Sequence, residues 1–245
     1  MKKQKPRLSG GSRGFTLIEL LVSTLIMSVI VGAVVSQITV MQQRTRTEQA
    51  KVDIFQESRD FVDQFVRDAH QAGYPSARMF DTSSWTTAPL SPIYTEPKLA
   101  AGIVFIGPSE IKFEGDVEGD GMVDVVDYNL LATGNNCPCL RRGAVDKTSG
   151  TAVFSNEVQN VQSAGTTADP IFVGYTAAGA AVTSADLTTL AGRQALATIK
   201  TIQIRLKTKA GVVDPKTGQA PESTLGGQVT IVNCSLTATG QTNSC

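Results

Sequence analysis

The stretch that decides the fold is GFTLIELLVSTLIMSVIVGAVVSQITVM, residues 14–41. It holds one charged residue, Glu19, and the next charge along the chain is Arg44. Leu, Ile, Val, Ala and Met dominate the run from Leu20 to Met41. A helix rises about 1.5 Å per residue, so this run can cross the roughly 30 Å hydrocarbon layer of a membrane. We therefore expect a membrane-spanning helix over residues 15–41.

Positive charge gathers ahead of this helix, in a segment without acids: Lys2, Lys3, Lys5, Arg7 and Arg13. Such an excess marks the cytoplasmic side and places the rest of the chain outside. A secretory signal peptide has an apolar region of about 7 to 15 residues followed by a small residue at its cleavage site. Here the small residue, Gly14, precedes the apolar run. Cleavage between Gly14 and Phe15 would remove a leader, residues 1–14, and keep the helix.

Glu19 is unusual because an ionised carboxylate near the start of a membrane helix costs several kcal/mol unless it finds a partner. Removal of the leader creates such a partner, the new α-amino group on Phe15 of a neighbouring subunit. That pair would neutralise both charges and set the axial stagger between subunits. Alternatively, Glu19 lies at the membrane interface and is solvated there.

The string from Arg13 to Val22, RGFTLIELLV, resembles the prepilin processing motif shared by type IV pilins and type II secretion pseudopilins. The resemblance implies that a prepilin peptidase cuts after Gly14 and methylates the new N-terminus on Phe15. It also implies that Glu19 is needed for assembly. The implied partners are other pilins or pseudopilins, the prepilin peptidase, the inner membrane and its assembly platform. The implied location is the inner membrane, with the head outside the cytoplasm, and then a pilus or pseudopilus filament.

Helical spacing continues after Met41, and we expect an amphipathic continuation over residues 42–72. Its apolar positions recur at three- and four-residue steps: Val52, Phe55, Val62, Phe65, Val66 and Ala69. Gly73, followed by Pro75, supplies a stop signal. The string FVRDAHQAGY, residues 65–74, resembles the close of this helix in PilW-like minor pilins, although His70 departs from the arginine expected there.

Strand signals dominate the predicted head, residues 73–245, after a Pro- and Ser/Thr-rich loop over residues 75–100. The predicted strands are residues 103–106, 111–114, 123–131, 140–142, 153–154, 171–175, 199–207 and 228–236. A Gly/Pro-rich link over residues 210–227 joins the last two into a meander. We expect an α+β fold, with the long helix laid across one antiparallel sheet. The element order resembles PilW-like minor pilins and the J-type pseudopilins of type II secretion.

An acidic segment nearly follows the spacing of a calcium loop. The candidate ligands are Asp116, Glu118, Asp120, Asp124 and Asp127. The flanks read as strands rather than helices, which favours the alternative of a β-hairpin with a wet acidic tip at residues 118–121. Calcium is the one cofactor that the sequence suggests, and it stays an alternative.

Four cysteines in the last half of the chain fit folding in an oxidising compartment. A Cys234–Cys245 bridge would resemble the disulfide-bounded terminal region of many pilins. Cys137 and Cys139 would then pair with each other or with partners elsewhere. Four cysteines permit three connectivities, and the spacing does not choose among them.

No catalytic constellation is visible, so we do not expect an enzyme. His70 is the only histidine, and no nucleophile motif lies near it. Loss of the leader's five basic residues lowers the basic count from 22 to 17 against 22 acids, giving a mature charge of about −5. That balance indicates no specific nucleic-acid partner.

The sequence therefore predicts a PilW-like minor pilin that supports assembly of a type IV pilus. A J-type pseudopilin of a type II secretion pseudopilus is the nearest alternative. A membrane-anchored, calcium-dependent periplasmic binding protein is the alternative from another class.

Overall fold

A computed structural model describes residues 14–76, 96–135 and 137–233. The chain opens with one long helix, α1 (Leu17–Gln71), and continues into strands with one further short helix, α2 (Leu190–Thr198). The strands are β1 (Ile103–Ile106), β2 (Glu110–Gly115), β3 (Asp124–Leu131), β4 (Cys139–Asp146), β5 (Val153–Val158), β6 (Phe172–Thr176), β7 (Ala181–Val182), β8 (Ala185–Asp186), β9 (Ile199–Lys209) and β10 (Glu222–Thr230). Contacts divide the chain into two compact units, residues 1–46 and 47–245. The second half of α1 therefore belongs to the head.

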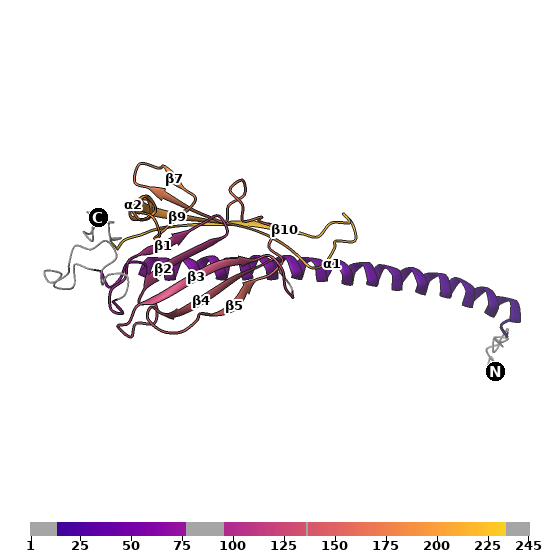
Figure 1. Cartoon of the computed structure of the whole chain (residues 1–245). Coiled ribbons are helices and arrows are strands. Elements are labelled where there is room, and N and C mark those ends of the chain that lie inside the picture. Colours follow the sequence, from indigo (N-terminus) through magenta and orange to yellow (C-terminus); the bar gives the residue numbers. More distant parts are fainter. Residues whose placement is uncertain (1–13, 77–95, 136, 234–245) are drawn as a thin grey trace, which may run out of the picture. The chain divides into compact units, whose positions relative to one another are not determined.

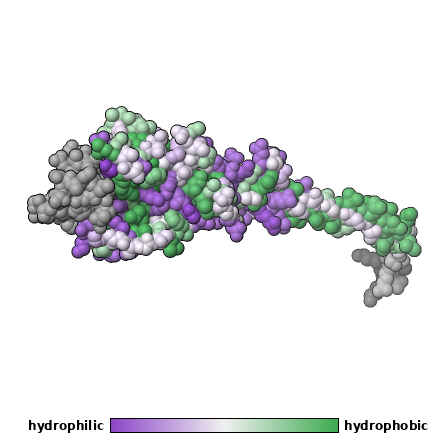
Figure 2. Space-filling view, viewed as in Figure 1, coloured by the Kyte–Doolittle hydropathy of each residue, from purple (hydrophilic) through white to green (hydrophobic). Residues whose placement is uncertain are grey.

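In the first unit, the described residues form a helix that buries nothing. Every residue from Gly14 to Arg46 is exposed, and Figure 2 shows hydrophobic residues gathered on this segment. By length and composition it can cross a membrane. Its hydroxyl groups donate to the carbonyl of an earlier turn, as from Ser28 to Thr24 at 2.7 Å and from Thr39 to Val35 at 3.0 Å. These side chains therefore need no water partner in an apolar surrounding.

Two antiparallel sheets build the second unit (Figure 1). The six-stranded sheet has the order β5-β4-β3-β2-β1-β8, and the four-stranded sheet has the order β10-β9-β6-β7. A long apolar helix followed by antiparallel sheets confirms the predicted α+β, pilin-like fold class. The expectation of one sheet was wrong, because β6 pairs with β9 rather than with the earlier strands.

The second half of α1 packs on both sheets. Phe65 is fully buried, and its ring centroid lies 5.2 Å from that of Tyr128 on β3 and 5.7 Å from that of Phe172 on β6. Phe61 contacts Tyr128 as well, at 5.5 Å. One hydrophobic core thus joins the helix to both sheets.

The buried face of α1 differs in part from the predicted one. Val52 and Phe55 were expected in the core, but they are 51% and 44% exposed. The buried positions of α1 are Thr47, Ile54, Ser58, Phe61, Val62, Phe65, Asp68 and Ala69. The buried face includes polar residues, so a search for apolar residues alone does not identify it correctly. Ser58, for example, is buried and lies 3.2 Å from the Thr208 hydroxyl of β9.

The predicted pairing of the last two strands is confirmed, with nine residue pairs between β9 and β10. The predicted bounds were wrong, because β10 covers Glu222–Thr230 rather than residues 228–236. The glycine pair Gly226-Gly227 was assigned to the link but lies within the strand. A Cβ at Gly227 would sit 2.5 Å from Val62 Cγ1, so the strand needs glycine there to approach the helix.

Three short elements were not predicted. Helix α2 is capped by the Thr189 hydroxyl, which accepts from the Gly192 amide at 3.0 Å. Strands β7 and β8 have two residues each. Elements this short carry little periodic signal.

The end of α1 follows the predicted stop signal. Gly73 has a φ of 82°, a conformation that glycine adopts without strain. Its amide donates to the Glu114 carbonyl at 2.8 Å, which ties the end of the helix to β2. From the other end of the chain, the Asn233 side-chain amide donates to the His70 and Ala72 carbonyls at 3.1 and 3.2 Å.

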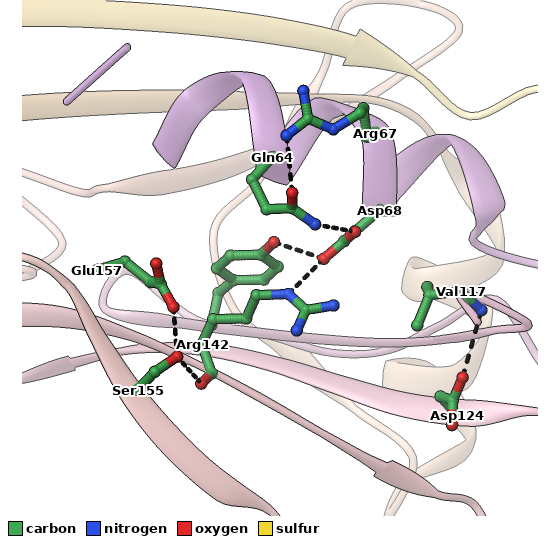
Figure 3. A network of polar contacts seen from close by, with 9 residues as sticks. Gln64, Arg67, Asp68, Val117, Asp124, Arg142, Ser155 and Glu157 are labelled. Atoms are coloured by element: carbon green, nitrogen blue, oxygen red, sulfur yellow. Dashed lines mark hydrogen bonds and ion pairs between the residues drawn. The ribbon is translucent and has the colours of Figure 1, made fainter. Parts of the chain in front are cut away.

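A buried carboxylate, Asp68, holds the helix to the six-stranded sheet (Figure 3). Its Oδ2 accepts from the Tyr128 hydroxyl at 2.6 Å and from Arg142 Nε at 2.6 Å. Its Oδ1 accepts from Gln64 Nε2 at 2.7 Å. Burial, and after it the Asp68 charge, raises the pKa of Tyr128, so the phenol keeps the proton that it donates.

A second buried pair lies between Glu114 on β2 and Lys147, just after β4. Glu114 Oε2 accepts from Lys147 Nζ at 2.7 Å and from the Ala101 amide at 2.8 Å. Lys147 Nζ also donates to the Leu99 carbonyl at 2.7 Å. Burial raises the pKa of Glu114, against the opposing effect of Lys147. The pair fixes the buried segment that enters β1.

Asp68→Ala should lower the free energy of unfolding by about 3 to 5 kcal/mol, because Arg142 would be left partly buried without its partner. Chemical denaturation monitored by circular dichroism measures this change. Asp63→Ala is the matched control on the same helix, since Asp63 is exposed and lies 3.8 Å from Arg59. We expect the control to change stability by less than about 0.5 kcal/mol. Equal effects of the two variants would contradict the assigned role of Asp68.

Candidate functional site

The predicted processing site lies on exposed backbone at the start of the described chain. Gly14 and Phe15 precede the helix, which begins at Leu17. Phe15 is 81% exposed, and no atom lies within 4 Å of the place where a Gly14 Cβ would be. The peptide bond between them is therefore free of helical hydrogen bonds and open to a protease. Residues 1–13 of the predicted leader lie outside the described residues.

Thr16 and Glu19 form a reciprocal cap at the start of α1. The Thr16 amide and the Thr16 hydroxyl each donate to Glu19 Oε2 at 3.0 Å. The Glu19 amide in turn lies 3.4 Å from the Thr16 hydroxyl, which accepts from it. This is a capping box, in which two residues three apart satisfy each other's free donors. Its sequence signal is Thr-x-x-Glu before an apolar run, and the cap is absent from the expectations above.

The cap changes how Glu19 can be understood. From the sequence, Glu19 pairs with a partner in another subunit or is solvated at the membrane interface. The structure adds a partner within the chain, so the carboxylate is hydrogen-bonded before any assembly. Hydrogen bonds from Thr16 leave the negative charge in place, however, and the apolar surface around it supplies no cation. The need for a positive partner in an apolar surrounding therefore remains.

Apolar side chains surround Glu19 on its face of the helix. Those nearest in helical spacing are all exposed: Phe15, Ile18, Val22, Ile26 and Ile30. Glu19 is the single charge on a surface that water solvates poorly. This surface, the predicted cleavage site beside it and one capped carboxylate make up the candidate assembly site.

The acidic segment forms the predicted hairpin tip between β2 and β3. The Asp116 carboxylate accepts from the Gly119 amide at 2.7 Å and from the Gly121 amide at 3.1 Å. Both glycines have positive φ angles, 76° and 85°. The Asp124 carboxylate lies 3.3 Å from the Val117 amide, which donates to it across the base of the tip (Figure 3). Asp116 and Asp120, two of the candidate calcium ligands, thus accept hydrogen bonds from backbone amides of their own turn.

The structure does not gather the candidate calcium ligands Asp116, Glu118, Asp120, Asp124 and Asp127 into one metal-binding group. Asp127 lies opposite Lys112 in the ladder and forms an ion pair with it at 3.2 Å. Asp124 and Asp127 are three residues apart on β3, so their side chains point to opposite faces of the sheet. Across the residues that the structure describes, no group of three or more His, Cys, Asp or Glu is placed to hold a metal ion. Asp116, Glu118 and Asp120 lie in the turn between β2 and β3, whereas Asp124 and Asp127 lie on β3.

Of the cysteines, Cys137 and Cys139 form a disulfide with each other. The structure thus shows one of the two arrangements that the sequence left open for this pair. Cys234 and Cys245, whose pairing the resemblance to pilins implies, lie outside the described residues.

The comparison with protein families finds a match at the N-terminal end of the chain. The family model described as the prokaryotic N-terminal methylation motif matches residues 10–35, a range that includes Gly14, Phe15 and Glu19. No curated protein matches the chain. The motif supports a type IV pilin-like protein, which implies cleavage by a prepilin peptidase and assembly with other pilins. The apolar helix behind the motif is consistent with membrane anchoring.

Gly14→Val should block cleavage, because a branched side chain would enter the space beside the bond that the peptidase must reach. Gly32→Val is the matched control, since its Cβ also meets nothing within 4 Å. Intact-mass measurement of the purified chain separates the two forms, with or without residues 1–14. We expect the precursor mass for Gly14→Val and the mature mass for the control. A mature Gly14→Val chain, or a wild-type chain that keeps Met1, would contradict the assignment.

Proposed function

We propose that this chain is a minor pilin of the PilW-like kind, a structural subunit rather than an enzyme, which supports assembly of a type IV pilus. The single observation behind the proposal is the methylation motif on a helix that buries no described residue before Thr47. A soluble protein does not leave such a helix uncovered. In the proposal a membrane covers it before assembly, and the helices of other pilins cover it afterwards.

The exposed apolar surface is too large for water. Between Phe15 and Met41 the large apolar side chains are exposed by 36% at Val40 to 85% at Leu17. Full burial of one such side chain is worth roughly 1.5 to 3 kcal/mol. Because these residues occur on all sides of the helix, a single partner surface cannot cover them. Lipid and a bundle of helices are the surroundings that can.

Cleavage and assembly are coupled through Glu19. The capping box holds Glu19 Oε2 3.0 Å from the amide of Thr16, the residue that follows Phe15. The carboxylate is thus presented at the level where cleavage creates a new α-amino group. Pairing of that carboxylate with the amine of a neighbouring subunit neutralises both charges among apolar side chains. An uncleaved chain has no such amine, so it stays in the membrane.

The close of α1 supports the PilW-like assignment. Residues 65–74 resemble the helix end of that group. In the structure, three of these residues hold the helix to the head or end it. Phe65 fills the core, Asp68 binds the sheet through Arg142, and Gly73 ends the helix. The J-type pseudopilin is the second candidate, because its helix and sheet order are similar to those predicted here. We do not propose the calcium-dependent binding protein, because no group of three or more His, Cys, Asp or Glu in the described residues is placed to hold a metal ion.

Fractionation of cells separates the two candidates. Deleting the assembly platform of the pilus, or that of the secretion system, should trap the mature chain in the membrane only for the machine that uses it. We expect trapping when the pilus platform is lost, with the chain found in sheared pili of the wild type. Trapping by loss of the secretion platform alone would assign the chain to a pseudopilus.

Two substitutions of Glu19 separate the cap from the charge. Glu19→Gln keeps an oxygen for the Thr16 donors but removes the charge, whereas Glu19→Val removes both. If the amine of a neighbour is the partner, both variants should insert in the membrane normally and enter filaments about tenfold less, as expected for a loss of about 1.4 kcal/mol. Immunoblots of sheared filaments and membranes measure this. Normal incorporation of Glu19→Gln would show that the cap is sufficient and the pairing between subunits is not needed.

A further inference from the structure

The two sheets end in four edges, and these edges are unequal. Strands β7 and β8 have two residues each, whereas β5 has six and β10 has nine. An edge strand presents unpaired amides and carbonyls that can bind a strand of another chain. Within the described sheets, β5 and β10 are the edges long enough for such pairing.

The outward side of β10 can be assigned from the ends of its ladder with β9. The Ala210 amide donates to the Pro221 carbonyl, and the Ile231 amide donates to the Lys200 carbonyl, both at 2.8 Å. Odd-numbered residues of β10 therefore face β9, and even-numbered residues direct their amides and carbonyls away from it. The outward residues, all exposed, are Glu222, Thr224, Gly226, Gln228 and Thr230.

This outward row is unprotected. None of its amides and carbonyls has a hydrogen-bond partner in the part of the chain that the structure describes. No charged residue and no proline occurs from Ser223 to Thr230. Soluble proteins usually protect a long edge with such residues or with a covering element. Apart from Glu222 at its start, the open edge carries no charge, and such an edge is a site for strand addition.

Strand β10 runs in the same direction as α1. Its start, at Glu222 and Ser223, lines a groove with Val52 and Phe55 of the helix. Gly227 approaches Val62 farther along, and Asn233 binds the last turn of the helix. The exposed Val52 and Phe55 therefore lie beside the open edge.

Strand β5 runs in the opposite direction. Near its start, Ser155 pairs with Arg142, which binds Asp68 of the helix. Just past its end, the Gln159 amide donates to Glu57 at 2.9 Å. Along its length, the strand therefore runs from a position beside Asp68 of α1 to a position beside Glu57, toward the N-terminal end of the helix.

The two edges lie on opposite flanks of α1 (Figure 1). Phe55 borders the groove beside β10, while Glu57 borders a second groove with Arg142 and Glu157 of the other sheet. At 3.6 residues per turn, positions 55 and 57 point about 200° apart around the helix. Two copies standing side by side in one orientation therefore bring β10 of one and β5 of the next together, running antiparallel.

We infer that the β10 edge of one copy pairs with the β5 edge of a second copy in antiparallel fashion. The common orientation of the copies rests on the proposed function, since both helices insert in the same membrane from the same side. The contact covers Val153, which is 86% exposed at the start of β5. Glu157, the acid of β5, meets no like charge between Ser223 and Thr230. Because the two surfaces differ, the contact extends from copy to copy in a row.

A photoreactive amino acid at Gln228, introduced into the full chain in membranes, tests the inference. We expect a cross-linked dimer whose joined peptide contains residues 153–158. Cross-links to β10 of a second copy, cross-links to a different protein, or a chain that stays uncross-linked would each overturn it. The N-terminal mass in the same sample reports cleavage after Gly14. A cleaved chain without the cross-link rejects this contact alone, whereas an uncleaved chain rejects the proposed function.

Variants of each edge sharpen the test in the same background. Thr224→Pro removes one outward amide and should lower the cross-linked dimer about tenfold, while Thr224→Ala should leave it unchanged. Thermal melting checks that both variants fold.

If Thr224→Pro does not fold, Val153→Asp changes the opposite edge at an exposed side chain. It should lower the dimer similarly, whereas Val213→Asp, at a 57% exposed position between β9 and β10, should not. Unchanged dimer in Val153→Asp would overturn the inference.

Discussion

One continuous helix must satisfy two surroundings, and the rest of the structure follows from that constraint. Up to Arg46 the described part of α1 is exposed on every side, and from Thr47 its inner face is buried under two sheets. The first half therefore needs apolar residues all round, and the second half needs one buried stripe. The head cannot shift along such a helix without losing that stripe. Buried polar contacts hold the sheets at one position along the helix.

Buried polar groups give the packing its register. Phe65 and Val62 would pack against many apolar surfaces, but Asp68 is satisfied only where Tyr128 and Arg142 meet it. A displaced Asp68 would be a buried charge without partners, which costs more than a lost apolar contact. The pair therefore selects one arrangement of helix and sheet rather than adding much net stability.

The sequence was sufficient for the long helix, its stop at Gly73 and most strands, because those features have strong local signals. It was insufficient where tertiary contacts override local pattern. Ser58 is polar yet buried, because its hydroxyl forms a hydrogen bond with the Thr208 hydroxyl of β9. Gly227 looks like a link residue, yet it is needed in a strand that touches the helix. The spacing from Asp116 to Asp127 resembles a calcium loop, but the last two carboxylates, Asp124 and Asp127, lie on β3 and point to opposite faces of the sheet.

The way the end of α1 is held has a mechanical consequence. Pro75 follows Gly73 closely, and the last turn is tied to β2 through the Glu114 carbonyl and to the end of the described chain through Asn233. A pulling force along the axis of α1 acts on these hydrogen bonds and on the Asp68 contacts one turn earlier in the helix at the same time. The load then acts in shear across several bonds at once and does not peel them one after another. A head attached in this way resists pulling better than one joined to its helix by a flexible tether, a property that suits the proposed place in a filament.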